Sequence, residues 1–230
     1  MTIIAMSSGL FEPTPANALL RAYILGLVNA ERPRVAYLAT ASGDSAPAIV
    51  DFYTAFTPDR CEPSHLALFA RTVDDLRSYI LRQQVIYVSG GNTANLLAVW
   101  RTQGLDEILR EAREKGVVLC GNSAGGLCWF DCGITDSFGP TLAPLTNGLG
   151  FLPGSFCPHY DSEGQRRPTY QRCVGEGMAS GWAIDDGVAL RFEGRELREI
   201  VSAVPAARAY RVERADDSVR ETPVSPRHLM

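Results

Sequence analysis

The sequence lacks both a long hydrophobic run and an excess of basic residues. No apolar run reaches the roughly 18 residues that a membrane-spanning helix needs, and residues 1–9 lack the basic segment and long apolar core of a secretory signal. The formal net charge of −4 argues against a nucleic acid or an anionic membrane as a partner. We therefore expect a cytoplasmic protein that binds neither.

Metal-ligating residues are also scarce. The chain has only three histidines, and none of its six cysteines forms a C-x-x-C pair. Several cysteines fall in apolar, strand-like stretches, so free and mostly buried thiols in a reducing compartment are a simpler interpretation than disulfides or a zinc site. The sequence predicts neither a bound metal nor an organic cofactor.

Short apolar strands alternate with helical segments over residues 14–131. A chain of 230 residues is below the size at which cores split, so we expect one α/β domain over residues 1–220. The fold should have three layers, with a mostly parallel sheet between helices. After residue 131 loops and antiparallel β pieces are expected, including a hairpin over 181–194. Residues 221–230 contain two prolines and no periodicity, so we expect a frayed tail there.

The most informative stretch begins with an apolar strand at Val117. It continues as Gly121-Asn122-Ser123-Ala124-Gly125, which matches the G-x-S-x-G pattern of a nucleophile elbow. A strand that reverses sharply into a helix, here expected over 124–131, needs strained backbone angles and close contact between strand and helix. Residues two positions either side of Ser123 must therefore be nearly free of side chains. Such a turn holds the serine hydroxyl at the carboxyl edge of the sheet, beside backbone N–H groups that favour negative charge.

A second backbone-rich turn, Gly90-Gly91-Asn92-Thr93, follows the apolar strand predicted over 84–89. Active sites of parallel sheets lie at the carboxyl ends of the strands. We therefore expect this turn and the Ser123 elbow to share one rim.

A serine nucleophile needs a neighbouring base, most often a histidine. His228 lies in the expected tail, and His65 is predicted to open a strand, which would put it at the amino edge of the sheet. His159 follows an apolar, strand-like segment and so lies at a carboxyl end. It is the best placed of the three histidines to act as the base.

The residues alone do not identify the acid that orients this base. Asp136 lies in the loops after the elbow helix, and Asp185 and Asp186 lie at a turn or strand start. Either segment could approach the imidazole of His159, whereas Asp161 is too near in sequence to reach back easily. Aspartate is also common at turns because it caps its own backbone.

Five segments together resemble the peptidase E (aspartyl dipeptidase) family of serine peptidases, with cyanophycinases as more distant relatives. They occur in the family's order over about residues 33–192. The segments are Gly90-Gly91-Asn92-Thr93, Gly121-Asn122-Ser123-Ala124-Gly125, Ile134-Thr135-Asp136, Pro158-His159-Tyr160 and Ile184-Asp185-Asp186-Gly187.

The resemblance implies a flavodoxin-like fold of the class I glutamine amidotransferase kind, with a serine at the elbow where those enzymes carry a cysteine. It implies Ser123 as nucleophile, His159 as base and an oxyanion hole from the N–H groups near Gly91 and Ala124. Both acidic positions have been favoured in this family. We expect Asp186 to orient the histidine and Asp136 to shape the site.

One departure from the family bears on the substrate. Aspartyl dipeptidases carry an arginine, shortly after the histidine segment, that pairs with the aspartate of the substrate. Alignment on Gln171-Arg172 puts Thr169 at that position. Substrate contacts are then expected from Asn92, Thr169 and Arg172, without the bidentate clamp that selects a carboxylate. We predict a serine peptidase for short peptides with a weak or absent preference for aspartate.

Two alternative functions share parts of this pattern. An esterase of the α/β-hydrolase kind also has the elbow, but its histidine normally follows several strand–helix units later, whereas 36 positions separate Ser123 and His159 here. A glutaminase with the amidotransferase fold could use Cys120 as its nucleophile, but Cys120 lies three residues before Ser123, inside the predicted strand. A binding protein without catalysis would be expected to lose Ser123 or His159, and both are present. A homodimer formed by the C-terminal β segments is also possible.

Overall fold

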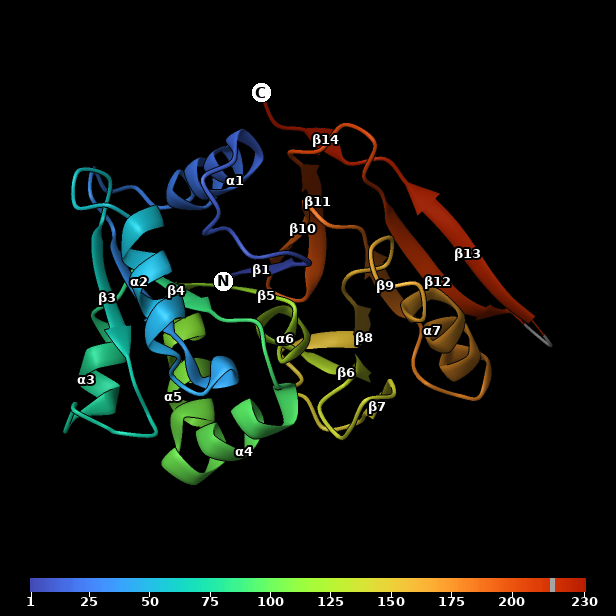
Figure 1. The fold of residues 1–230 in the computed structure, drawn as a ribbon, viewed down its shortest axis with the longest axis horizontal. Coiled ribbons are helices and arrows are strands. Elements are labelled where there is room, and N and C mark those ends of the chain that lie inside the picture. The colour runs from blue at the N-terminus through green and yellow to red at the C-terminus, as the bar shows by residue number, and fades with distance from the viewer. Residues whose placement is uncertain (216–217) are drawn as a thin grey trace.

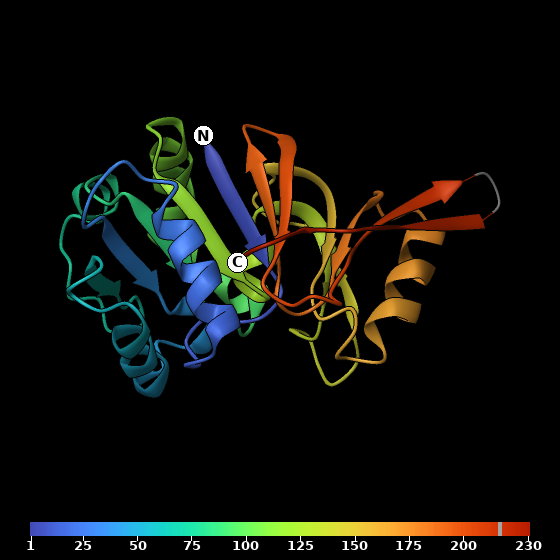
Figure 2. The same ribbon diagram turned by 90° about the horizontal axis from the view of Figure 1, so that it is seen from above.

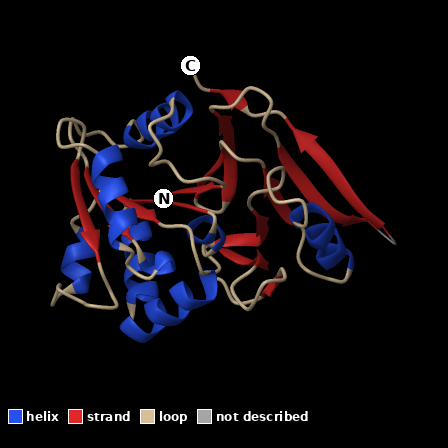
Figure 3. Cartoon of the chain, in the orientation of Figure 1, coloured by secondary structure: helices blue, strands red, loops and turns tan. Residues whose placement is uncertain are grey.

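The computed structural model describes residues 1–215 and 218–230. In these residues the strands form two sheets, of eight and six strands, and most helical residues surround the eight-stranded sheet (Figures 1 and 3). None of the helices described there is long and apolar enough to cross a membrane. The α-helices are α1 (Pro15–Leu25), α2 (Ala46–Ala55), α3 (Leu76–Leu81), α4 (Thr93–Gln103), α5 (Leu105–Glu114), α6 (Ala124–Leu127) and α7 (Arg166–Gly175).

The eight-stranded sheet is mostly parallel. Its strands, in spatial order, are β14 (Arg227–His228), β11 (Glu196–Ser202), β10 (Val188–Glu193), β1 (Thr2–Met6), β5 (Val118–Asn122), β4 (Val85–Val88), β2 (Arg34–Leu38) and β3 (Glu62–Leu66). All neighbouring pairs from β1 to β3 are parallel, whereas β10 and β11 extend the sheet with antiparallel pairs. The predicted α/β fold with antiparallel additions is confirmed.

Helices cover both faces of this sheet, because successive strand residues point to opposite sides. Ile4 and Met6 of β1 pack in a core with α1 and α2, whereas Ile3 and Ala5 face a second core with α3, α4 and α5. Figure 2 shows α1 and a green helix on opposite sides of the sheet. The three predicted layers are therefore present.

The central strand β1 comes from the first residues of the chain, which the sequence pattern did not identify as a strand. It lies between β5 and β10, and residues Ile3 to Met6 are almost fully buried. The turn Ser7-Ser8-Gly9 that follows β1 therefore lies at the carboxyl edge, next to the elbow that follows β5.

The six-stranded sheet packs against the first one. Its strands, in spatial order, are β13 (Ser218–Val224), β12 (Ala209–Ala215), β9 (Gly181–Ile184), β8 (Leu152–Cys157), β6 (Phe130–Thr135) and β7 (Ala143–Leu145). Phe130 and Phe156 stack with their ring centroids 4.9 Å apart and join the core of the eight-stranded sheet. The opposite face packs on α7 through Tyr170, Cys173 and Val212.

The predicted hairpin over 181–194 is wrong. Its first half is β9, which pairs with β8 and β12 in the six-stranded sheet. Its second half is β10, which crosses to the other sheet and pairs with β1 and β11. An alternating pattern predicts a strand but does not specify the partner of that strand.

The predicted frayed tail over 221–230 is also wrong. β13 pairs with β12 along its length, and β14 adds to β11. Pro223 is tolerated because β13 lies at the edge of its sheet, where none of the described strands needs an N–H group on the outer side. Leu229 is only 8% exposed and packs in the core with α1 and α2.

The helix after the elbow is shorter than the predicted range of 124–131. α6 ends at Leu127, and the chain enters β6 at Phe130. Phe130 stacks on Phe156 in the core between the two sheets. This packing favours a strand at Phe130, so the helix ends after one turn.

Candidate active site

Ser123 lies on a strained turn between β5 and α6. Its backbone has φ +50° and ψ −113°, a conformation that costs energy for a residue with a side chain and that occurs at functional sites. A Cβ atom on Gly121 would lie 2.4 Å from the carbonyl oxygen of Gly125, and one on Gly125 would lie 2.4 Å from that of Val88. Both flanking positions therefore require glycine for steric reasons, as a nucleophile elbow does.

The turn after β4 lies directly beside this elbow. A Cβ atom on Gly90 would be 3.4 Å from the Cβ of Ser123, and one on Gly91, at φ +133°, would be 2.2 Å from the carbonyl oxygen of Ala41. In the part of the chain that the structure describes, the backbone N–H groups of Gly91 and Ala124 have no backbone acceptor. Neither of the two amides predicted for the oxyanion hole is therefore engaged by the backbone of these residues.

His159 follows β8 and forms a hydrogen-bonded pair with Asp186. The imidazole Nδ1 lies 2.9 Å from Oδ1 of Asp186, and the histidine side chain is 17% exposed. Because the partner is an ionised carboxylate, we assign the proton to Nδ1, which leaves Nε2 as the proton-accepting atom. The backbone of His159 is held at φ +57°.

Asp186 is kept ionised by its surroundings. Burial raises the pKa of its carboxyl group, but hydrogen bonds from His159, Ser162 and Ser7 outweigh burial and hold the pKa at about 2. Its neighbour Asp185 turns away from the imidazole: an oxygen of Asp185 accepts a hydrogen bond from the backbone N–H of Arg208 at 2.8 Å.

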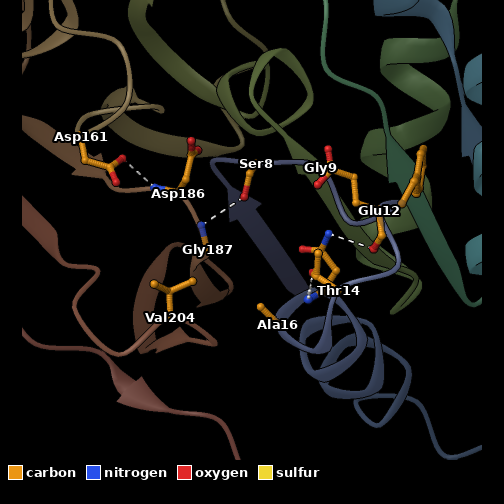
Figure 4. Close-up of a pocket in the computed structure, with 11 residues that line it drawn as sticks. Ser8, Gly9, Glu12, Thr14, Ala16, Asp161, Asp186, Gly187 and Val204 are labelled. Carbon is orange, nitrogen blue, oxygen red and sulfur yellow. Dashed lines mark hydrogen bonds between the residues drawn. The ribbon is translucent and has the colours of Figure 1, made fainter.

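The Asp186 turn lies between the loops that follow β1 and β8 (Figure 4). The backbone N–H of Asp186 donates to Oδ1 of Asp161 at 2.9 Å, and that of Gly187 donates to Oγ of Ser8 at 3.1 Å. A cavity of about 570 Å³ adjoins the turn at this place. The turn is thus fixed from both sides by hydrogen bonds.

The end of β1 links the nucleophile to the histidine–aspartate pair. The carbonyl oxygen of Met6 accepts a hydrogen bond from the backbone N–H of Ser123 at 3.0 Å. Oγ of the next residue, Ser7, accepts from the backbone N–H of His159 at 2.6 Å and donates to Asp186 at 2.7 Å. Ser123, His159 and Asp186, three of the predicted residues, therefore gather around two consecutive residues of β1 and its turn.

Asp136 lies elsewhere. It is exposed at the end of β6, and in the described part of the chain no hydrogen bond joins it to His159. The next residue, Ser137, ties this loop to the glycine turn, since its Oγ accepts from the backbone N–H of Thr93 at 2.9 Å. The side chain of Asn92 donates to the carbonyl oxygen of Ser137 at 3.0 Å and caps α4 through Asn95.

Thr169 and Arg172 lie on α7. Helix α7 packs on one face of the six-stranded sheet, whereas α6 packs in the core on the other face of that sheet. Arg172 is exposed and pairs with Glu176 at 2.9 Å. Among the described residues neither side chain forms a hydrogen bond with the residues around Ser123.

His65 is excluded as the base, but for a different reason than the one given from the sequence. It lies near the carboxyl end of β3 rather than at its start. However, β3 is the edge strand, separated from β5 by β2 and β4, and Nδ1 of His65 lies 2.8 Å from the hydroxyl of Tyr53.

The thiols do not offer an alternative nucleophile. All six cysteines are free, and five of them are buried. Burial raises the pKa of Cys120 well above its ordinary value, so its thiol is protonated at neutral pH. Among the described residues no three histidine, cysteine or acidic side chains gather closely enough to hold a metal ion.

Ser7 is the residue at this site that sequence reasoning missed. The signal was present, because Ile3 to Met6 form an apolar run followed by the small residues Ser7-Ser8-Gly9. The same pattern of a strand and a small-residue turn marks the other two segments at the rim.

Comparison with known proteins agrees with this architecture. A model of the family described as Peptidase family S51 matches residues 3–200. The chain is 49% identical over 228 residues to the "Uncharacterized peptidase YgaJ" of Bacillus subtilis (strain 168), covering 99% of this chain and 98% of that relative.

Two solved structures share the fold. One is a putative peptidase E protein from Listeria monocytogenes EGD-e, with a TM-score of 0.62, 17% identity and coverage of 97% of this chain and 98% of that chain. The other is a peptidase from an acI-B1 Actinobacterium, with a TM-score of 0.68, 17% identity and coverage of 98% and 94%. The extent of the family match and the close relative lead to one conclusion: this chain belongs to peptidase family S51, the peptidase E family, and is a serine peptidase.

Proposed function

We propose that this peptidase uses Ser123 as nucleophile, His159 as general base and Asp186 as the orienting acid, and that its substrates are short peptides. The observation that carries the proposal is the hydrogen-bonded His159–Asp186 pair, at 2.9 Å, held at the end of β1 beside the strained Ser123 turn. Each residue type has the chemistry that its role needs.

The reaction follows from these roles. Oγ of Ser123 attacks the scissile carbonyl carbon while Nε2 of His159 takes the hydroxyl proton. The backbone N–H groups of Gly91 and Ala124 stabilise the negative oxygen of the tetrahedral intermediate. The imidazolium then protonates the leaving amine, and a water molecule, activated by the same imidazole, hydrolyses the acyl-enzyme.

Asp186 contributes by remaining ionised. With its pKa at about 2, the carboxylate holds the proton on Nδ1 and stabilises the imidazolium that forms when Ser123 attacks. In this proposal Asp136 has no direct part in proton transfer. Its loop, through Ser137, supports the glycine turn that supplies the Gly91 amide.

The proposed substrate preference rests on the arginines near Thr169. Arg166 pairs with Glu163, Arg167 with Glu221 and Arg172 with Glu176. Each of these guanidinium groups already has a carboxylate partner within the chain. We therefore propose that none of them clamps an aspartate of the substrate, and that aspartyl peptides are not preferred. Asn92, Thr169 and Arg172 remain proposed substrate contacts, to groups of the substrate other than an aspartate carboxylate.

Location and assembly are proposals of the same kind. Six free thiols favour a reducing, cytoplasmic compartment. Among the described strands, β13 lies at the edge of its sheet, with no strand on its outer side, which favours pairing with a second copy in a homodimer.

A peptide panel tests the proposed function. Purified wild-type protein and Ser123→Ala would be incubated with dipeptides and tripeptides that differ in their first residue, including Asp-Leu and several neutral dipeptides. We expect hydrolysis of several neutral peptides by the wild type only. A strong preference for Asp-Leu would contradict the proposed selectivity, and hydrolysis of simple esters without any peptide hydrolysis would favour an esterase.

A further inference from the structure

Ser7 is a fully buried polar residue at the point where β1 meets the proposed active site. Its hydroxyl group has three neighbours from two distant parts of the chain. It donates to Oδ1 of Asp186 at 2.7 Å, accepts from the backbone N–H of His159 at 2.6 Å, and lies 3.4 Å from Nδ1 of the same histidine.

In these contacts the hydroxyl acts both as a hydrogen-bond donor and as a hydrogen-bond acceptor. Its one proton goes to Asp186 and a lone pair accepts the amide proton of His159. Oδ1 of Asp186 thus receives two hydrogen bonds, one from Ser7 and one from the imidazole of His159. The position of that oxygen, and with it the orientation of the imidazole, depends on the hydroxyl.

The backbone of His159 also depends on this contact. A φ of +57° is unfavourable for a residue with a side chain and persists only where the surroundings impose it. The short hydrogen bond to Ser7 is one such constraint. Since Met6, the preceding residue, accepts from the backbone N–H of Ser123, the same piece of chain sets the position of the nucleophile.

We propose that Ser7 is a positioning residue of this active site: its hydroxyl holds His159 and Asp186 in register with each other and with Ser123. The proposal rests on the proposed roles of those three residues. Ser7 itself touches neither substrate nor reacting atoms.

Kinetics of Ser7→Ala test this role. We expect kcat to fall about 10- to 100-fold, because a small misplacement of a catalytic group has an effect of that size, while KM changes little. Ser7→Cys retains nearly the same volume but replaces the O–H donor by a weaker S–H, so it should show the same loss and guards against a cavity effect in Ser7→Ala. Circular dichroism and thermal unfolding would verify that both variants fold.

The matched control is Ser202→Ala. Ser202 is 2% exposed, and its hydroxyl bonds only with backbone groups: it donates to the carbonyl oxygens of Gly187 and Val204 and accepts from the N–H of Val204. The substitution Ser202→Ala removes a similarly buried hydroxyl close to the Asp186 turn, and this hydroxyl forms no hydrogen bond with the side chains of His159 and Asp186. We expect its kcat to be that of the wild type.

A spectroscopic readout decides the proposal independently of peptide hydrolysis. The hydrogen-bonded Nδ1–H proton of His159 should give a downfield nuclear magnetic resonance signal in the wild type and in Ser202→Ala, and lose it or shift it in Ser7→Ala and Ser7→Cys. An unchanged signal together with wild-type kcat in both Ser7 variants would overturn the proposal.

Failure of the proposed function gives a different result. In that case the wild type hydrolyses no peptide and Ser123 resists a serine-directed phosphonate, while the Nδ1–H signal still reports whether Ser7 positions the pair.

Discussion

The two halves of the proposed active site are built in different ways. The half around Ser123 consists of glycine-rich turns that follow the neighbouring parallel strands β4 and β5, and backbone atoms form most of it. The half around His159 consists of side chains from three distant segments, at residues 7, 159 and 186, where the two sheets meet. The first half is fixed by local steric limits, and the second by tertiary contacts.

This difference predicts different effects of mutation. A change in the side-chain half should lower the rate and leave the fold intact, because residues 7, 159 and 186 are polar and none of them belongs to a hydrophobic core. A change in the glycine half should destabilise the fold, because backbone carbonyl oxygens occupy the space that a new side chain would need.

The largest expected effect is that of His159→Ala. Removing the base should lower kcat/KM by about 10⁴-fold or more, as in other enzymes with a serine–histidine unit, with little change in the thermal midpoint. Steady-state kinetics and differential scanning calorimetry would measure both. A loss below tenfold would show that this half does not carry the reaction.

The next effect is on stability. Gly125→Ala places a methyl group 2.4 Å from the carbonyl oxygen of Val88 and should lower the free energy of unfolding by about 3 kcal/mol. Gly164→Ala is the control, since no atom lies within 4 Å of the added Cβ there. Equal urea midpoints for the two variants would contradict the steric account of the elbow.

The two acids should differ in their effect on the rate. Asp186→Asn keeps the shape but removes the charge that holds the proton on Nδ1 of His159, so we expect kcat to fall by about 10²- to 10⁴-fold. Asp136→Asn, at an exposed position, should change it by less than about threefold. Kinetics of both variants on one neutral dipeptide make the comparison. The reverse order would assign the orienting role to Asp136.

The smallest effect is the pH dependence of stability. The hydrogen bonds of Asp186 outweigh its burial and lower its pKa to about 2 from an ordinary 3.8, so the folded state takes up the proton less readily than the unfolded state. The stabilisation is therefore fully present above about pH 4 and is lost as the pH falls through 2. Urea unfolding of wild type and Asp186→Asn between pH 5 and 2.5 should give a difference that shrinks with acid. A difference that stays constant would contradict this.

The same contrast explains how much the sequence revealed. The glycines around Ser123 are required by close backbone contacts, so the elbow could be predicted from five residues. His159 could be chosen because the chain has only three histidines and this one follows an apolar, strand-like segment. The residues alone left Asp136 and Asp186 open, and only the family resemblance favoured Asp186. The pattern does not show that β9 and β10 belong to different sheets, with a junction that brings Asp186 to the imidazole.

Ser7 and the C-terminal strands show the limit of pattern reasoning. The apolar run and small-residue turn could have placed Ser7 at the rim, but nothing local shows that it bonds to residues more than 150 positions away. The tail around Pro223 was predicted to fray because prolines break strands in general, yet an edge strand accepts one. In both cases the deciding information is the neighbour, which the sequence pattern does not contain.

The most direct measurement of the central claim is covalent labelling of the nucleophile. A fluorophosphonate should react with one serine of the wild-type protein, mass spectrometry of the digest should identify it as Ser123, and activity should fall in proportion to labelling. His159→Ala should slow the reaction strongly. Labelling of another residue, or full peptide hydrolysis by Ser123→Ala, would contradict the account.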